Sequence, residues 1–419
     1  MTKQQKLKIK KQHHSSHKKY FGGRTLTLII FIALIIFLFL AAYSPNSYNS
    51  REDGGSYIIP VMITNDTIDG REYLRGIEMA VEDKNRIREI PIVRNFFCEI
   101  IPAYMDYGKN ETNASVAEYA LTNYYTAYNM EMPVILGPES SSGMEAIAPS
   151  AETLHTAILS PGASSTALRA YPDYVYSLYP SDSYLSATLA STVAAFFEDD
   201  GEHSLAVVYD TGAYAAGIME QVEDELDNYP ALNVSYFDLG TAADNIKETA
   251  EKVRMINSEF IMFLPGSYEQ GTAFVSEVLK LGVYTTWAGT EYCLSDKTAA
   301  LFDGKNGYFY VFSPSNTIID DDFIRRYEER YGSKCTIEAA YGYDAMMILS
   351  TIIQDGHGET AEDAAVHLKN MRYIGVTGMI SFDETGAQFP KYDVLSAQNG
   401  RWNTETWKDI LSFENEHEY

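Results

Sequence analysis

Two serine-rich loops follow short apolar runs in the first half of the chain. Residues 134–143 read VILGPESSSG, and residues 158–166 repeat the pattern as ILSPGASST. Each run predicts a buried parallel strand that carries small polar residues at its carboxyl end, where α/β sheets bind ligands. A helix expected at 144–155 adds free N–H groups that attract an anion. We expect a polar site for a small carboxylate; the alternative is that the serines only cap helices.

Strand and helix patterns alternate over most of the chain. Strands are expected at 57–63, 93–102, 204–210, 233–238, 260–264, 285–289 and 307–312, and helices at 71–88, 113–128, 184–198, 216–228, 244–256, 270–281, 321–331 and 337–354. This rhythm predicts an α/β fold with mainly parallel sheets flanked by helices. It restarts after residue 184, and 419 residues are many for one core, so two units are expected.

The charge of the chain is uneven. The formal net charge is −26, from 32 Lys and Arg against 58 Asp and Glu, yet the first 50 residues hold eight basic and no acidic side chains. The acidic remainder repels phosphate backbones, which argues against nucleic-acid binding.

Residues 25–43 are uncharged and long enough to span a bilayer. The basic residues before this run should stay in the cytoplasm, which places the rest of the chain on the outer face of the cell membrane. We therefore expect a basic cytoplasmic tail at 1–24, a single transmembrane anchor at 25–43 and a linker at 44–56. A cleaved signal peptide is the alternative.

No motif predicts catalysis, a cofactor or a metal site. The three cysteines, Cys98, Cys293 and Cys335, show no metal-ligand spacing, and their disulfide state stays open. The chain lacks GxSxG, HExxH and phosphate-loop motifs, and none of its eight histidines shares a loop with a plausible nucleophile.

Several stretches, in this order, carry a family resemblance: RGIEMAVE at 75–82, GPESSS at 137–142, SPGASS at 160–165, VVYDTGAY at 207–214, AYGYDA at 340–345 and ISFDETG at 380–386. Over residues 57–402 the chain resembles a type I periplasmic binding protein, in particular the branched-chain (Leu/Ile/Val) amino-acid-binding proteins of ABC importers. The resemblance implies two lobes that close on a ligand, joined by crossovers near Tyr179, Ser313 and Val376. Lobe 1 would comprise 57–178 plus 314–376, and lobe 2 would comprise 179–313 plus 377–405, followed by a tail at 406–419.

The same resemblance implies the roles of individual residues. Ser141, with Ser142 beside it, would hold the ligand carboxylate, and the loop with Ala163, Ser164 and Ser165 would lie near both charged ends. From the other lobe, Tyr214 and Tyr268 would cover the ligand, and Glu291 would pair with its ammonium. The physical requirement agrees, since both charges of a zwitterion need partners once they leave water.

The first loop departs from the family pattern. The family places an aromatic residue near the ligand side chain, and the nearest position by spacing here is Asp69. Either Tyr73 takes over the packing, or Asp66 or Asp69 accepts a polar or cationic side chain. Preference for leucine-like ligands is therefore open.

The expected function is capture of a small branched-chain or other neutral amino acid and its delivery to ABC permease subunits in the membrane. The alternative is a receptor ectodomain that reports an amino-acid-like ligand to a partner protein.

Overall fold

The structure is a computed structural model that describes residues 55–89, 97–105, 132–197, 201–240, 245–304, 308–390 and 392–405. The predicted cytoplasmic tail, membrane anchor, most of the linker, the helix expected at 113–128 and the C-terminal tail lie outside these residues. Within the described part of the chain, no helix is both long and apolar enough to cross a membrane.

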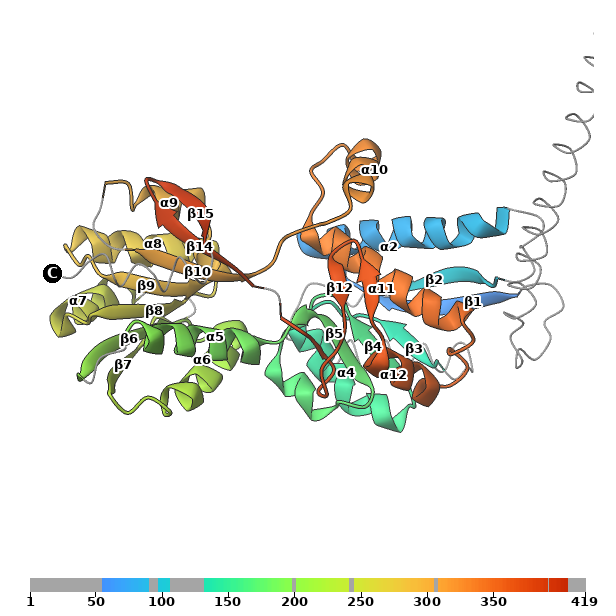
Figure 1. The fold of residues 1–419 in the computed structure, drawn as a ribbon, viewed down its shortest axis with the longest axis horizontal. Helices are drawn as coiled ribbons and strands as arrows, with labels where there is room; N and C mark the ends of the chain where they lie inside the picture. Colours follow the sequence, from blue (N-terminus) through green and yellow to red (C-terminus); the bar gives the residue numbers. More distant parts are fainter. Residues whose placement is uncertain are drawn as a thin grey trace, which may run out of the picture. The chain divides into compact units, whose positions relative to one another are not determined.

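The first lobe is built on a six-stranded parallel sheet with the strand order β13-β5-β4-β3-β1-β2 (Figure 1). Its strands are β1 (Ser56–Met62), β2 (Glu99–Met105), β3 (Val134–Leu136), β4 (Ala157–Ser160), β5 (Val175–Pro180) and β13 (Ala387–Gln388). Its helices are α2 (Ile68–Arg86), α4 (Ser141–Thr153), α10 (Asp321–Tyr331), α11 (Ile337–Gln354) and α12 (Ala361–Asn370), and a small hairpin joins β11 (Tyr373–Gly375) to β12 (Gly378–Ile380).

Both faces of this sheet are covered, which explains why its central strands β3 and β4 are buried at every position and almost wholly apolar. Leu136 and Leu159 pack with α2 and α11 in one core, whereas Ile135 and Ile158 point the other way and pack with α4. The apolar runs before the serine loops are therefore buried strands, as the sequence predicts.

The second lobe is built on a seven-stranded sheet with the order β15-β14-β10-β9-β8-β6-β7. Its strands are β6 (His203–Tyr209), β7 (Leu232–Asp238), β8 (Phe260–Leu264), β9 (Thr286–Thr290), β10 (Phe309–Pro314), β14 (Tyr392–Gln398) and β15 (Arg401–Glu405). The strand β14 pairs antiparallel with both β10 and β15. Helices α5 (Asp182–Ala195) and α6 (Ala213–Leu226) cover one face; α7 (Ile246–Ile256), α8 (Tyr268–Lys280) and α9 (Asp296–Ala300) cover the other (Figure 1).

The chain passes between the two sheets after β5, after β10 and after β13. The third passage differs from the predicted crossover near Val376. Ile380 and Phe382 pack in the core of the first lobe, and β13 pairs in parallel with β5, so residues 377–388 stay with that lobe. The apolar pattern alone did not indicate which sheet this short strand would join.

Close packing of α2 on α11 orients one side of the site. A Cβ at Gly76 would overlap the carbonyl of Ala339, and a Cβ at Gly342 would overlap the carbonyl of Tyr73. Both positions therefore require glycine, because the two helix backbones touch there. This contact brings the first turns of α2 and α11 close together.

Candidate functional site

Three predicted ligand residues of the second lobe follow neighbouring parallel strands. Tyr214 lies in the first turn of α6 after β6, Tyr268 begins α8 after β8, and Glu291 directly follows β9. Since β6, β8 and β9 are adjacent in the sheet, their carboxyl ends place these residues at one edge.

A buried hydrogen bond fixes the two helix starts relative to each other. Gln270 Nε2 donates to Asp210 Oδ2 over 2.7 Å, and Asp210 Oδ1 accepts from Gly212 N over 2.6 Å. Ser267 caps α8 by accepting from Gln270 N. The positions of Tyr214 and Tyr268 are thus set by bonded neighbours.

Three polar atoms at this edge are buried without a hydrogen-bond partner among the residues that the structure describes: Glu291 Oε2, Tyr214 Oη and Thr290 Oγ1. Burial raises the pKa of Glu291, which its own backbone N–H and the nearby Tyr214 hydroxyl offset only in part. Burial followed by the charge of Glu291 raises the pKa of Tyr214 well above its ordinary value, against a smaller opposing effect of Thr290. The three side chains are therefore close together, although none of these atoms makes a well-formed hydrogen bond within the described residues. Buried polar groups are nearly always paired in folded proteins, so this set points to a ligand that supplies the missing bonds.

Tyr292 belongs to this edge, although the sequence analysis did not select it. Its ring packs edge-on against Tyr214, with centroids 5.0 Å apart, and against Tyr268, with centroids 5.3 Å apart. Three aromatic rings therefore stand beside Glu291. The available signal was its place directly after Glu291, which alone does not distinguish it among 32 tyrosines.

The first serine loop starts α4, as predicted, and its members divide their roles. Ser140 Oγ accepts from Gly143 N over 3.1 Å and so caps the helix. Ser141 Oγ accepts from the backbone N–H groups of Ser164 and Ser165, each over 3.2 Å, which ties the two loops together. The hydroxyl hydrogen of Ser141 remains a donor for an anion beside the helix start.

Ser164 directs its hydroxyl to an acid that the sequence analysis missed. Ser164 Oγ donates to Asp182 Oδ2 over 3.1 Å, and Asp182 begins α5 directly after the first passage between lobes. Burial, and then the charge of Glu291, raises the pKa of Asp182 to about 7. The oxygen of Ser164 can accept from an ammonium, so this pair fits the positive end of a ligand.

The other residues predicted in these loops have bonded or packed positions. Ser142 Oγ lies 3.5 Å from Ser140 Oγ, and Ala163 is fully buried with its carbonyl accepting from Ser177 Oγ. Ser165 donates to Glu145 and caps the 3-10 helix Thr166–Ala170. Ser140 and Ser165 therefore cap helices, which is the alternative role considered for the serines of these loops.

Asp69 is exposed in the first turn of α2, and Tyr73, one turn later, is buried. The Tyr73 hydroxyl reaches the second serine loop, where a Cβ at Gly162 would overlap it. Glu338 lies in the first turn of α11, next to Ala339, whose carbonyl touches α2 at Gly76. Burial, and then the charges of Glu338, Glu139 and Asp69, raises the pKa of Tyr73 well above its ordinary value.

Electrostatic effects connect the residues of the two lobes. Burial, and then the charges of Glu291, Glu338 and Asp69, raises the pKa of Tyr268. Burial and Glu291 do the same for Tyr179, which also responds to Tyr73 and Asp182. We call this set the interlobe cluster: Asp69, Tyr73, Ser141, Ser164, Tyr179, Asp182, Tyr214, Tyr268, Glu291, Tyr292 and Glu338.

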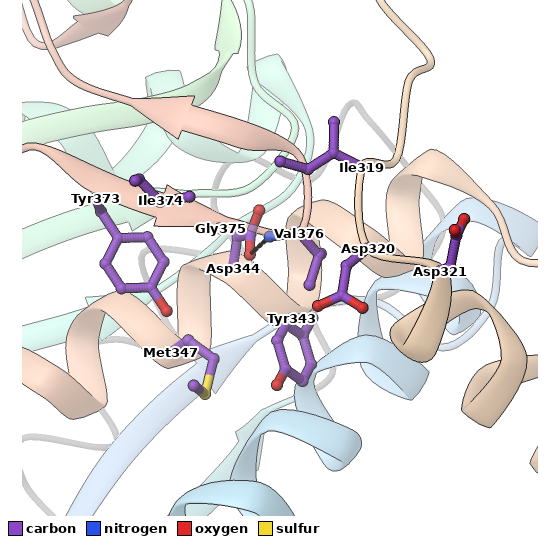
Figure 2. A pocket seen from close by; sticks show the side chains of 10 residues that line it. All are labelled: Ile319, Asp320, Asp321, Tyr343, Asp344, Met347, Tyr373, Ile374, Gly375 and Val376. Atoms are coloured by element: carbon purple, nitrogen blue, oxygen red, sulfur yellow. Dashed lines mark hydrogen bonds between the residues drawn. The ribbon is translucent and has the colours of Figure 1, made fainter.

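A separate cavity of about 400 Å³ lies beside α11 and the β11–β12 hairpin, lined by residues other than the predicted ones (Figure 2). Asp344 at its wall is fully buried and accepts from Val376 N over 2.8 Å and from Thr377 N over 2.9 Å. A Cβ at Gly375 would overlap this carboxylate. Asp344 therefore serves to anchor the hairpin to α11.

The structure also brings together three residues that the sequence analysis left unassigned, at and just before α12. His357 Nδ1 lies 3.1 Å from Asp363 Oδ2, and His367 Nδ1 lies 3.4 Å from Asp363 Oδ1. The i, i+4 spacing of Asp363 and His367 on one helix was the available signal.

Two α/β lobes joined by three passages, with polar side chains of both gathered near strand ends, define a two-lobed ligand-binding protein. The chain belongs to the family described as the receptor family ligand binding region, whose model matches residues 74–400. The structural neighbours include branched-chain amino-acid-binding proteins, which confirms the type I periplasmic-binding fold expected from the sequence. No curated protein sequence matches the chain.

The leucine-binding protein LivK from Thermotoga maritima has a TM-score of 0.63 at 19% identity, covering 84% of this chain and 98% of that one. The branched-chain amino acid transporter substrate binding protein LivJ from Streptococcus pneumoniae, solved with isoleucine, has a TM-score of 0.62 at 18% identity. The match covers 84% of this chain and 99% of that one. A solute binding protein from R. palustris, solved with benzoate, has a TM-score of 0.62 at 12% identity, and the match covers 84% of this chain and 95% of that one. These likenesses show the fold; those proteins carry different ligands on it.

Proposed function

We propose that this protein is an extracytoplasmic solute-binding protein that captures an amino acid between its two lobes and delivers it to an ABC permease. The observation that carries the proposal is the set of buried atoms without partners, Glu291 Oε2, Tyr214 Oη and Thr290 Oγ1, beside a second acid, Asp182. An ammonium supplies N–H donors to the carboxylates, and charge-assisted bonds of this kind are strong.

The negative end of the ligand has a matching position on the first lobe. Ser141 offers its hydroxyl at the start of α4, where the helix dipole favours an anion. Its links to Ser164 N and Ser165 N hold the second loop in place. A ligand that touches Ser141 on one lobe and Glu291 on the other binds the closed arrangement more tightly, which drives closure.

Tethering by residues 25–43 is part of the proposal, as is the absence of catalysis. An anchored binding protein meets the permease by diffusion in the plane of the membrane. The family description and the structural neighbours, which are ligand-binding proteins, support a binding role.

The test is calorimetry of the full-length chain, purified in detergent, against the twenty amino acids. Saturable heat with at least one of them supports the proposal; no heat and no thermal shift with any of them refutes the ligand class. Loss of cellular uptake of that amino acid on gene deletion separates delivery from sensing, because a sensor leaves uptake capacity in place.

A further inference from the structure

Two histidines and one aspartate meet beside the start of α12 in the first lobe, and none of them belongs to the interlobe cluster. His357 lies in the loop between α11 and α12, and Asp363 and His367 lie one turn apart on α12 (Figure 1). Each offers one ligand atom, and these atoms lie within 4.8 Å of one another. Among the residues that the structure describes, this is the one group of three histidine, cysteine or acidic side chains with metal-ligand spacing.

The carboxylate of Asp363 serves the two histidines rather than the helix start. Thr360 caps α12 by accepting from Asp363 N over 3.1 Å. An acid at this third helical position often returns a hydrogen bond to the capping residue. Here Oδ2 lies 3.1 Å from His357 Nδ1, and Oδ1 lies 3.4 Å from His367 Nδ1. Both carboxylate oxygens therefore face an imidazole.

His357 Nδ1 and Asp363 Oδ2 have the spacing of two ligands of one metal ion. Atoms bound to a tetrahedral zinc at about 2.0 to 2.1 Å lie roughly 3.3 Å from each other. The measured separation of 3.1 Å is close to this value. A zinc ion would take the position of the proton that the nitrogen and the oxygen otherwise share, because metal ligands bind in their deprotonated form.

His367 brings the third ligand. Its ring stacks on that of His357, with centroids 3.3 Å apart and planes 17° apart. A metal ion lies in the plane of each imidazole that binds it, so binding turns one ring out of this stack. The side chains have room to turn, since His357 is 38% exposed and His367 is 40% exposed. The same exposure leaves a fourth coordination position for water.

The loop that carries His357 is fixed by its own bonds. Gly356, with a φ of 91°, follows the end of α11, and His357 N then donates to the carbonyl of Ile352 over 2.9 Å. Tyr57 Oη, from β1, donates to the carbonyl of Gly358 over 2.7 Å. Because the backbone is held on both sides of His357, metal binding needs to order little more than side chains.

The alternative is that the three side chains only bond to one another, as two other histidine–acid pairs do. His155 pairs with Glu362, and His203 pairs with Glu259. Each of those pairs has a single imidazole, which is all that such a bond requires. A transition-metal site requires several nitrogen and oxygen ligands around one point, and the group on α12 supplies them.

We propose that His357, Asp363 and His367 bind one divalent transition-metal ion of the zinc type. Two imidazoles and one carboxylate, with a fourth position open to water, form a ligand set that zinc accepts. The bound ion fastens α12 to the loop after α11 and stabilises the folded protein, because it binds the folded state.

The test is calorimetry with Zn²⁺ on the full-length protein in detergent. The histidines at the two ends of the chain are replaced by Ala in this background, so that they contribute no binding: His13, His14, His17 and His417. Zn²⁺ should bind at one site with micromolar or tighter affinity and raise the melting temperature, whereas Mg²⁺, which prefers oxygen ligands, should do neither. No zinc binding, or zinc binding no tighter than that of Mg²⁺, overturns the inference.

Three variants in that background locate the ion. His357→Ala, Asp363→Asn and His367→Ala should each weaken Zn²⁺ binding more than about tenfold, because each removes one of three ligands. Each changes a partly exposed side chain, so the metal-free melting temperature should stay close to that of the starting protein while its rise with Zn²⁺ is lost.

His155→Asn is the matched control. It alters the exposed histidine that pairs with Glu362 in the first turn of the same helix, and asparagine tolerates the φ of 48° at this position. This variant should keep full zinc affinity. Unchanged affinity in both His357→Ala and His367→Ala, or a loss in His155→Asn as large as theirs, overturns the inference.

Discussion

Replacing Glu291 by glutamine separates the roles that its carboxylate has with and without ligand. Oε2 is buried and accepts no hydrogen bond from the described residues, and burial raises the pKa of the group. Without ligand, an ionised carboxylate in this position destabilises the fold, since the cost of its burial exceeds the gain from its own backbone N–H and from the Tyr214 hydroxyl. With an amino acid bound, the same carboxylate pairs with the ammonium.

The two effects have opposite signs. Loss of a buried pair of this kind costs about 2 to 5 kcal/mol of binding free energy. At about 1.4 kcal/mol per factor of ten, Glu291→Gln should raise the dissociation constant by about 30-fold to several thousand-fold. The ligand-free variant should nevertheless melt at a higher temperature than the natural protein, because the amide carries no charge and can donate to Tyr214 Oη.

Calorimetry and thermal unfolding of the same preparation measure both effects. Glu251→Gln serves as the control, because Glu251 pairs with Arg254 at the protein surface, and this change should alter the free energies of binding and of unfolding by less than about 0.5 kcal/mol. An unchanged dissociation constant in Glu291→Gln refutes the assignment of this residue to the ammonium. A lower melting temperature without ligand would refute the argument that the buried carboxylate destabilises the ligand-free protein.

Three further predictions concern the loops around Glu291. Ser141→Ala removes the acceptor for Ser164 N and Ser165 N and one donor for the ligand carboxylate, and calorimetry should show a loss of about 1 to 3 kcal/mol, smaller than that of Glu291→Gln. The pKa of Asp182 is raised from 3.8 to about 7 in the folded state, so the folded protein binds a proton more tightly than the unfolded chain does. The ligand-free protein should therefore gain stability as the pH falls from about 7 to about 4. Thermal unfolding across that range should show a weaker dependence of stability on pH in Asp182→Asn. Because Glu291, Arg169, Ser164 and Glu145 all act on Asp182, a slope unchanged in Asp182→Asn would assign the effect to another group. Gly162→Ala places a Cβ on the Tyr73 hydroxyl and should destabilise the protein by about 1 to 3 kcal/mol in denaturant unfolding, whereas an unchanged midpoint would show that the loop yields freely.

The serine loops could be predicted from sequence because a local apolar pattern marks the strands before them and a general rule places ligands at the carboxyl ends of such strands. The apolar runs followed by GlyPro in one case and ProGly in the other indicated β3 and β4, and the rule that ligands bind at strand ends indicated the serine loops. The same rule applied to the segment after β5 would have selected Asp182. The capping pattern of Thr360 and Asp363 would have indicated α12, which the sequence analysis missed.

Other features depend on contacts between distant segments. Glu338 joins the site because Gly76 and Gly342 allow α2 and α11 to touch, and nothing local to Glu338 shows this. Tyr292 joins through ring contacts with two tyrosines from other loops. The third passage between lobes was placed too early, since the two-residue strand β13 has no periodic pattern of its own.

The measurement that tests the central claim most directly is a crystal structure of the protein with its bound amino acid. The account predicts the ligand carboxylate within hydrogen-bond distance of Ser141 Oγ and the α-ammonium within hydrogen-bond distance of Glu291. A ligand bound elsewhere, or one whose ammonium has no contact with Glu291, would contradict it.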